Sequence, residues 1–289
     1  MFTEHDAPIL LVFGQSNAHG HSLAMAPKDR ISHPLAHVLG LRQADNQNYQ
    51  LEKPVWSGYT SDGTNLGEIQ DHTYCMPNYF SLYWEEECRK GPAVWPALRI
   101  IRISVGAEGV TQKFMWHPDY PLIQVPGPLG TVRLALYSLA CQVLRCVTED
   151  LKQQGKIPKI LALHWLGGEE DTCIPPEELQ ELEPLYHRIM DGFFEAAGGS
   201  FPIRFYEICS RKRVLAMGEY EESLHIINNT FHRLAVHYPS SAVISAADSP
   251  DWDETDPLCG IFQPDGGHYT ARTQEWFARK AFSELCSSI

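Results

Sequence analysis

The chain has 289 residues, of which 44% are hydrophobic and 20% charged, and its 23 basic and 36 acidic side chains give a formal net charge of −13 with histidine neutral. This balance is typical of a globular protein and excludes disorder throughout the chain. The acidic surplus argues against proteins that follow nucleic-acid phosphates or dock on anionic lipid, because both need a basic face.

The N-terminal segment carries no targeting signal that we can identify. Met1–Asp6 has no basic cluster, and the apolar run Pro8–Phe13 is too short for the core of a signal peptide. No apolar run approaches the ~20 residues that span a bilayer. We therefore expect a cytoplasmic protein without a membrane partner.

Five short runs that are apolar throughout predict strands buried on both faces, which is typical of a parallel sheet. They are Ile9–Phe13, Leu98–Val105, Ile160–Leu163, Ile203–Cys209 and Ala242–Ala246.

Helical patterns lie between and after these runs, with apolar residues three or four positions apart. They cover Val132–Leu151, Leu179–Ala197, Leu224–Tyr238 and Ala278–Leu285, the last opened by Thr270. The alternation predicts an α/β fold, a three-layer α/β/α sandwich with a central parallel sheet of about five strands.

We expect a single domain over residues 1–289, interrupted by a long excursion at about 14–97 with a helix near Tyr79–Arg89. The aromatic residues of 49–84 either stack on sugar rings or form a local core, since large aromatics serve both purposes.

The eight cysteines form no Cys-x-x-Cys pair, so a zinc site is not expected. We predict mostly reduced core thiols, with a Cys75–Cys88 bridge as the alternative. His19 and His21 lack a third ligand at suitable spacing, and we expect no metal and no cofactor.

The first strand ends in Gly14-Gln15-Ser16-Asn17. A serine at a strand-to-helix turn exposes its hydroxyl at the carboxyl edge of the sheet, and the following helix directs N–H groups at an anion formed there. This is what a nucleophilic serine requires. Serine and asparagine are also ordinary helix caps, so this block alone is a weak signal.

The last loop holds Asp265 and His268, separated by two glycines. A histidine base must reach the serine, and a carboxylate should hold its imidazole in the right tautomer. The alternative is a polar turn with a surface histidine.

Two more segments follow predicted strands, Ser104–Gly109 and Trp165–Asp171. Glycine at such a turn allows a backbone N–H to approach a substrate oxygen, whereas the alternatives are a tight turn and a solvated acidic segment. All four segments lie at one edge of the predicted sheet, in the chain order Ser, Asp, His.

These spaced blocks resemble the SGNH (GDSL-like) hydrolase superfamily, in its sialate O-acetylesterase-like and carbohydrate esterase family 6 branch. The resemblance implies a flavodoxin-like fold with Ser16 as nucleophile, His268 as base and Asp265 as the acid of the triad. The glycine block is matched by Gly106 with Trp116, and Gly109 is a rival for that glycine. The Trp-x-Gln-Gly-Glu-x-Asp block is matched by Trp165, Gly168, Glu169 and Asp171.

One position departs from this branch, because Gly167 stands where the family has glutamine. The glutamine is expected to donate to the oxyanion, and losing such a donor costs ~2.7–4 kcal/mol of transition-state stabilisation. The remaining oxyanion hole would consist of the N–H groups of Ser16, Gly106 and Gly167. The side chains considered as substitutes for the glutamine are Asn17, Asn78 and His164.

The resemblance implies a serine esterase that removes O-acetyl groups from a carbohydrate through an acetyl-enzyme. Gln15, Asn17, Trp116 and Glu169 would support the site or bind substrate, a small-molecule or oligosaccharide acetyl ester. The first alternative is a pseudo-esterase that binds acetylated glycans without turnover. The second is a lipid or thioester hydrolase of the same superfamily.

Overall fold

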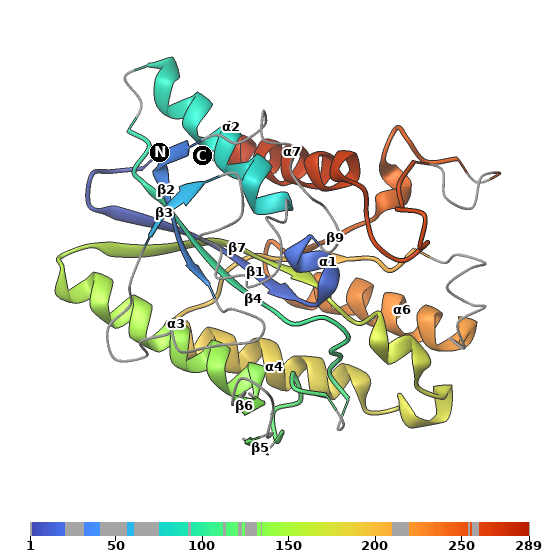
Figure 1. Cartoon of the computed structure of the whole chain (residues 1–289). Helices are drawn as coiled ribbons and strands as arrows, with labels where there is room; N and C mark the ends of the chain where they lie inside the picture. Colours follow the sequence, from blue (N-terminus) through green and yellow to red (C-terminus); the bar gives the residue numbers. More distant parts are fainter. Residues whose placement is uncertain are drawn as a thin grey trace.

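The computed structural model describes residues 2–20, 32–40, 57–60, 75–91, 94–111, 114–120, 123–124, 132–133, 135–209, 220–253, 255 and 260–288. Within these residues, one sheet runs through the molecule in the order β3-β2-β4-β1-β7-β8-β9 (Figure 1). Its strands are β1 (Asp6–Gly14), β2 (Ser32–Gly40), β3 (Ser57–Thr60), β4 (Leu98–Ser104), β7 (Ile157–Leu166), β8 (Ile203–Tyr206) and β9 (Ala242–Ile244).

The five predicted strands are confirmed as β1, β4, β7, β8 and β9, and all their pairings are parallel. Counted along the chain, these five lie in the order 2-1-3-4-5, which is the flavodoxin-like arrangement. The sheet extends further than predicted, because β2 adds a parallel strand beside β4 and β3 pairs with β2 in the antiparallel direction.

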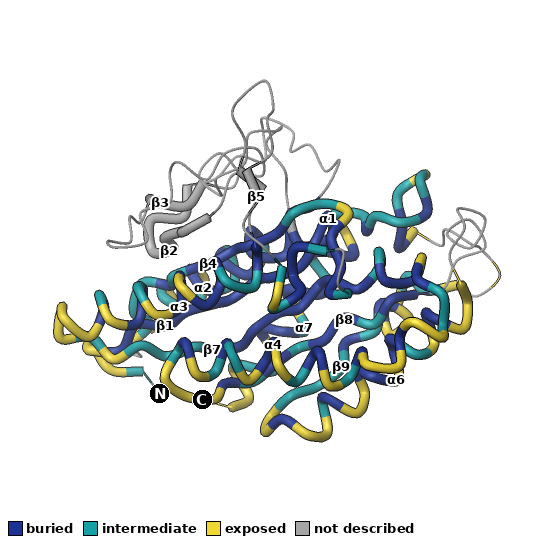
Figure 2. The backbone as a smooth tube through the Cα atoms, turned by 90° about the horizontal axis from the view of Figure 1, so that it is seen from below, coloured by how far each residue is buried: buried dark blue, intermediate teal, exposed yellow. Residues whose placement is uncertain are grey.

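Helices cover both faces of the sheet, so the predicted three-layer sandwich is confirmed (Figures 1 and 2). Alternate residues of β1 point to opposite sides. Ile9, Leu11 and Phe13 join the core under α3, α4 and α6, whereas Leu10 and Val12 join the core under α2 and α7. The helices are α1 (Ser16–His19), α2 (Met76–Lys90), α3 (Leu136–Gln153), α4 (Leu182–Ala197), α6 (Glu221–His237) and α7 (Ala271–Ser288).

Two predicted helices begin later than their apolar spacing indicated. Val132 belongs to β6 (Val132–Arg133), which pairs with β5 (Ile123–Gln124), and α3 starts only at Leu136. Leu179 closes the 3₁₀ turn η4 (Pro176–Glu178) ahead of α4. Both residues continue the helical spacing, but the backbone of Val132 belongs to a strand and that of Leu179 to the end of a 3₁₀ turn.

The excursion lies largely outside the described residues, including Trp56, Tyr74 and His21. Its predicted helix is confirmed as α2, and Trp84 on that helix is fully buried against Phe2 and Trp95. This tryptophan is therefore part of the core and is not a sugar platform.

The described cysteines are all free thiols, so the alternative Cys75–Cys88 bridge is wrong. Cys75, Cys141 and Cys209 are buried, whereas Cys173 and Cys286 are exposed. No helix in the described part of the chain is long and apolar enough to cross a membrane.

One buried carboxylate ties the first strand to its neighbour. Asp6 Oδ2 accepts hydrogen bonds from the Thr3 N–H at 2.7 Å and from Lys159 Nζ at 2.9 Å. The Lys159 ammonium, together with the Thr3 backbone, holds the pKa of Asp6 below its usual value. Because the folded pKa is lowered, the ionised group stabilises the fold above the unfolded pKa of about 3.9, and this contribution is lost as the pH falls through the folded pKa.

Asp6→Asn should therefore lower the free energy of unfolding by ~1.5–3 kcal/mol near neutral pH, because it removes acceptors for a charged donor. The difference from wild type should shrink below about pH 4. Urea denaturation at both pH values checks this, with exposed Asp248→Asn as the control. Equal stability of Asp6→Asn and wild type at neutral pH would refute the role of the ion pair.

Candidate active site

Gly14 ends β1 where this strand comes closest to β7. Its φ is +145°, and a Cβ on this residue would lie 1.8 Å from the Leu166 carbonyl oxygen. The next residue, Gln15, donates its N–H to that same oxygen at 2.9 Å. Only glycine allows the two backbones this approach. The close contact fixes the turn that leads into Ser16 on α1.

The structure brings the three predicted triad residues together. The Ser16 hydroxyl lies 2.9 Å from His268 Nε2, and His268 Nδ1 lies 2.7 Å from Asp265 Oδ2. The nitrogen beside a carboxylate carries the proton, so Nε2 accepts from the serine hydroxyl. This is the tautomer that a general base needs.

Asp265 is held in its ionised form by the backbone of its own loop. Partial burial acts to raise its pKa, but the N–H groups of His268 and Gly267 and the imidazole outweigh this, and the pKa lies below its usual value. Asp265 Oδ1 accepts from Gly267 N at 2.9 Å and from His268 N at 3.0 Å. The two glycines therefore fold the loop so that acid and base meet.

Three backbone N–H groups are predicted to form an oxyanion hole. Within the described part of the chain, the N–H groups of Ser16, Gly106 and Gly167 donate to no other protein atom. Gly106 lies in the turn directly after β4. The rival Gly109 has another role, since a Cβ there would lie 2.5 Å from the Asp171 carboxylate.

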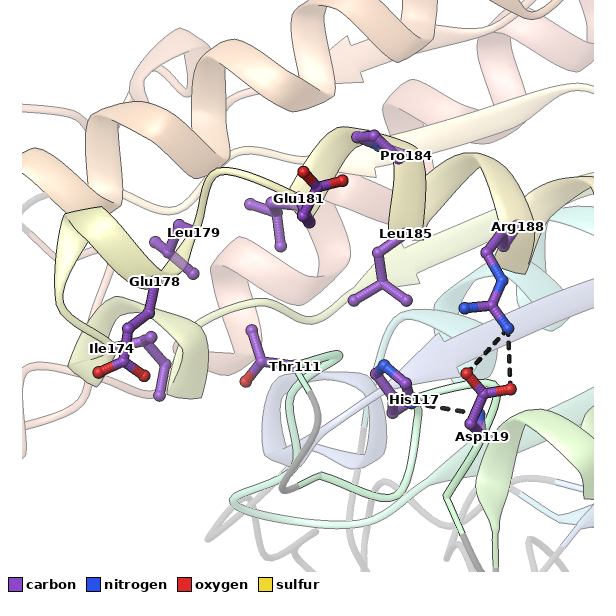
Figure 3. A pocket seen from close by; sticks show the side chains of 11 residues that line it. Thr111, His117, Asp119, Ile174, Glu178, Leu179, Glu181, Pro184, Leu185 and Arg188 are labelled. Atoms are coloured by element: carbon purple, nitrogen blue, oxygen red, sulfur yellow. Dashed lines mark hydrogen bonds and ion pairs between the residues drawn. The ribbon is translucent and has the colours of Figure 1, made fainter.

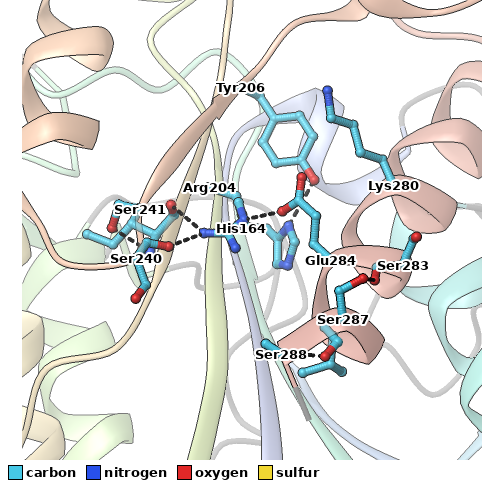
Figure 4. A network of polar contacts seen from close by, with 12 residues as sticks. His164, Arg204, Tyr206, Ser240, Ser241, Lys280, Ser283, Glu284, Ser287 and Ser288 are labelled. Atoms are coloured by element: carbon cyan, nitrogen blue, oxygen red, sulfur yellow. Dashed lines mark hydrogen bonds and ion pairs between the residues drawn. The ribbon is translucent and has the colours of Figure 1, made fainter.

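Two of the side chains considered as substitutes for the missing glutamine are engaged elsewhere. His164 Nδ1 lies 2.8 Å from the Tyr206 hydroxyl in a polar network with Arg204 and Glu284 (Figure 4). Burial lowers the pKa of His164 to about 3, so it is neutral. Asn17 uses its amide hydrogens on Glu169 and Gly267.

Trp116 lies inside the protein, beneath the turn that leads into Ser16. It is fully buried, and its indole N–H donates to the Gly14 carbonyl at 3.1 Å while its ring packs against Phe13 and Trp165. Gln15 is likewise buried, and its Oε1 meets no hydrogen-bond donor among the described residues. No face of Trp116 is accessible in the described structure, so its contacts are with the core and with the Gly14 carbonyl.

Asp171 organises the loop after β4, a role that the sequence did not reveal. Its carboxylate accepts the N–H groups of Val110 at 3.0 Å and Thr111 at 3.1 Å. Burial raises the pKa of Asp171 to about 6, although these two N–H groups oppose the shift. The acidic segment after β7 is thus buried at this residue and is not solvated throughout.

A pocket of about 710 Å³ lies between the loop after β4 and the segment leading into α4 (Figure 3). These two segments follow the strands on either side of β1, and the lining includes none of Ser16, Asp265 and His268. Its charged lining residues, among those described, are Asp119, Glu178, Glu181 and Arg188. Arg188 is paired with Asp119 at 2.8 Å, which leaves the lining acidic.

The described residues contain no cluster of His, Cys, Asp or Glu that could hold a metal ion. The sheet edge carries instead a hydroxyl, an imidazole and a carboxylate in series. Such a set can carry out nucleophilic acyl transfer.

The fold belongs to the flavodoxin-like class of α/β proteins. The chain is similar to NanS, with a TM-score of 0.61 and 11% identity over 99% of this chain and 98% of that chain. It is also similar to a protein from Arabidopsis thaliana, with a TM-score of 0.60 and 13% identity over 98% of both chains. The sequence matches no protein-family model and no curated protein. These likenesses establish the fold.

Asp171→Asn should lower the free energy of unfolding by ~1.5–3 kcal/mol, because an amide in place of the carboxylate loses charge-assisted bonds from Val110 and Thr111. Urea denaturation measures the change, with exposed Glu177→Gln as the control. Unchanged stability would mean that these backbone contacts contribute nothing to holding the loop.

Proposed function

We propose that this protein is a serine esterase that removes O-acetyl groups from a carbohydrate. The observation that carries the proposal is the unbroken hydrogen-bonded series from Ser16 through His268 to Asp265. The fold it shares with NanS is compatible with this proposal. Carbohydrate as the substrate class rests on the sequence resemblance to the sialate O-acetylesterase-like branch.

In the acylation step, Ser16 Oγ bonds to the ester carbonyl carbon while its proton passes to His268 Nε2. Asp265, ionised and 2.7 Å from Nδ1, stabilises the imidazolium that forms. The N–H groups of Ser16, Gly106 and Gly167 are the proposed donors to the oxyanion. His268 then gives its proton to the departing sugar oxygen as the carbon–oxygen bond breaks.

In the deacylation step, water replaces the sugar alcohol. His268 takes a proton from water as its oxygen attacks the acetyl carbon, and the proton then returns to Ser16 Oγ as acetate leaves. All groups that these steps need are supplied by the chain itself, so the proposed reaction requires no cofactor.

One observation favours a second function, a protein that binds acetylated glycans with little or no turnover. Gly167 supplies no side-chain donor, and the amide hydrogens of Asn17 are already committed. The retained triad argues against this alternative, because binding alone does not need a serine, a histidine and an aspartate in series.

The triad is tested with p-nitrophenyl acetate. Ser16→Ala and His268→Ala should each lower kcat by at least about 10³-fold, since members of a triad act as a unit. His232→Ala, an exposed histidine on α6, serves as the control. Equal background rates for wild type and all variants would exclude this esterase mechanism and direct attention to glycan binding.

The role of position 167 is tested by restoring the glutamine. A Cβ on Gly167 would meet its nearest neighbours, Gly14 Cα and the Trp165 ring, at 3.4–3.5 Å, which is ordinary contact. If a donor is missing, Gly167→Gln should raise kcat towards p-nitrophenyl acetate by roughly 10²-fold. Gly167→Ala is the matched control. Identical rates for the two variants would mean that the backbone donors suffice.

A further inference from the structure

Asn17 is not part of the triad, but its side chain makes several hydrogen bonds next to Ser16. It is 3% exposed, and its amide engages three partners at once. Nδ2 donates to Glu169 Oε1 at 2.9 Å and to the Gly267 carbonyl at 3.2 Å, while Oδ1 accepts the Tyr269 N–H at 3.0 Å. Gly267 and Tyr269 are the residues on either side of His268.

These contacts fix the peptide groups before and after the histidine. Asn17 is covalently next to Ser16, so the residue that holds the base in place is attached directly to the nucleophile. Its own backbone is also held, since Gln274 Nε2 on α7 donates to the Asn17 carbonyl at 3.0 Å. Ser16 and His268 are therefore linked through one residue, Asn17, and its hydrogen bonds to Gly267 and Tyr269. These contacts set the separation of 2.9 Å between Ser16 Oγ and His268 Nε2.

Glu169 decides which way the Asn17 amide points. With the amide reversed, Oδ1 would face two acceptors, Glu169 Oε1 and the Gly267 carbonyl, and the NH₂ group would face the Tyr269 N–H. Glu169 lies on the loop after β7 and makes its acceptor available there whether or not its other oxygen is protonated. Burial raises the pKa of this carboxyl, against the bond from Asn17.

We propose that Asn17 is a positioning residue that holds His268 in register with Ser16, and that Glu169 orients the Asn17 amide. The proposal rests on the proposed function, because positioning matters only if His268 acts as a base. It goes beyond the triad by assigning the histidine's placement to two residues, one on α1 and one on the loop after β7. It also predicts that the hydrogen-bond donor at position 17 and the acceptor at position 169 can be exchanged for one another.

The first test exchanges the donor and the acceptor. Asn17→Asp places a carboxylate oxygen against Glu169 and the Gly267 carbonyl, and kcat towards p-nitrophenyl acetate should fall about 10²-fold with KM little changed. In the double variant Asn17→Asp with Glu169→Gln, the glutamine amide can donate to the new carboxylate, so much of the loss should be recovered. Glu169→Gln alone keeps an acceptor for Asn17 Nδ2 and should therefore lose less kcat than Asn17→Asp.

A matched control separates positioning from general stability. Asn228 is also a largely buried asparagine whose amide bridges backbone groups, here the N–H and C=O of Ile208 at 2.9 and 2.8 Å. Asn228→Asp should lower stability but leave kcat per folded molecule unchanged. Should Asn17→Asp fail to fold, Glu169→Leu against Glu169→Gln tests the same orientation, with the larger loss of kcat expected for leucine, which offers Asn17 no acceptor.

A measurement independent of turnover completes the test. The proton on His268 Nδ1, bonded to Asp265, should give a downfield proton resonance in wild type and Asn228→Asp that is shifted or lost in Asn17→Asp. Full activity and an unchanged resonance in Asn17→Asp, or no recovery in the double variant, would overturn the proposal. If wild type hydrolyses no acetyl ester and Ser16 resists a fluorophosphonate probe, the proposed function fails, and the resonance still decides whether Asn17 positions His268.

Discussion

Position 14 has no room for a side chain, because β1 and β7 are in contact there. The arrangement of the candidate site depends on this steric constraint. Because Gly14 lies against the Leu166 carbonyl, β1 and β7 close on one another at the carboxyl edge of the sheet. The Gly14 carbonyl is then free to accept the Trp116 indole N–H and, at 3.4 Å, the Val105 N–H. One glycine thus joins the ends of three adjacent strands just ahead of Ser16.

The sequence predicts the central strands well because their apolar runs are continuous, as buried parallel strands require. β2 escaped prediction because His33, Pro34 and His37 interrupt its apolar pattern. The start of α3 was misplaced for a different reason. Val132 has the spacing of a helical residue, but spacing alone does not distinguish the first turn of a helix from the residues before it.

For the site, the sequence predicts which strand ends carry chemistry, since the side chains that follow parallel strands meet at one edge. It does not predict hydrogen-bond partners across distant loops. The contacts of Asn17 with Glu169 and Gly267 span 152 and 250 positions, and no local pattern indicates them. Trp84 was open to either interpretation because its chemistry suits both a sugar platform and a core, and only its burial decides between them.

The distance along the chain between Ser16 and His268 has a consequence for biosynthesis. Ser16 and His268 are 252 positions apart, and β1 lies between strands that are made much later. During synthesis the serine emerges long before its partner, and contacts of such long range form late in folding. A growing chain therefore carries an inert serine until residue 268 has been made and its loop has docked. Any hydrolytic activity would then arise in a single step, with the closing of that loop.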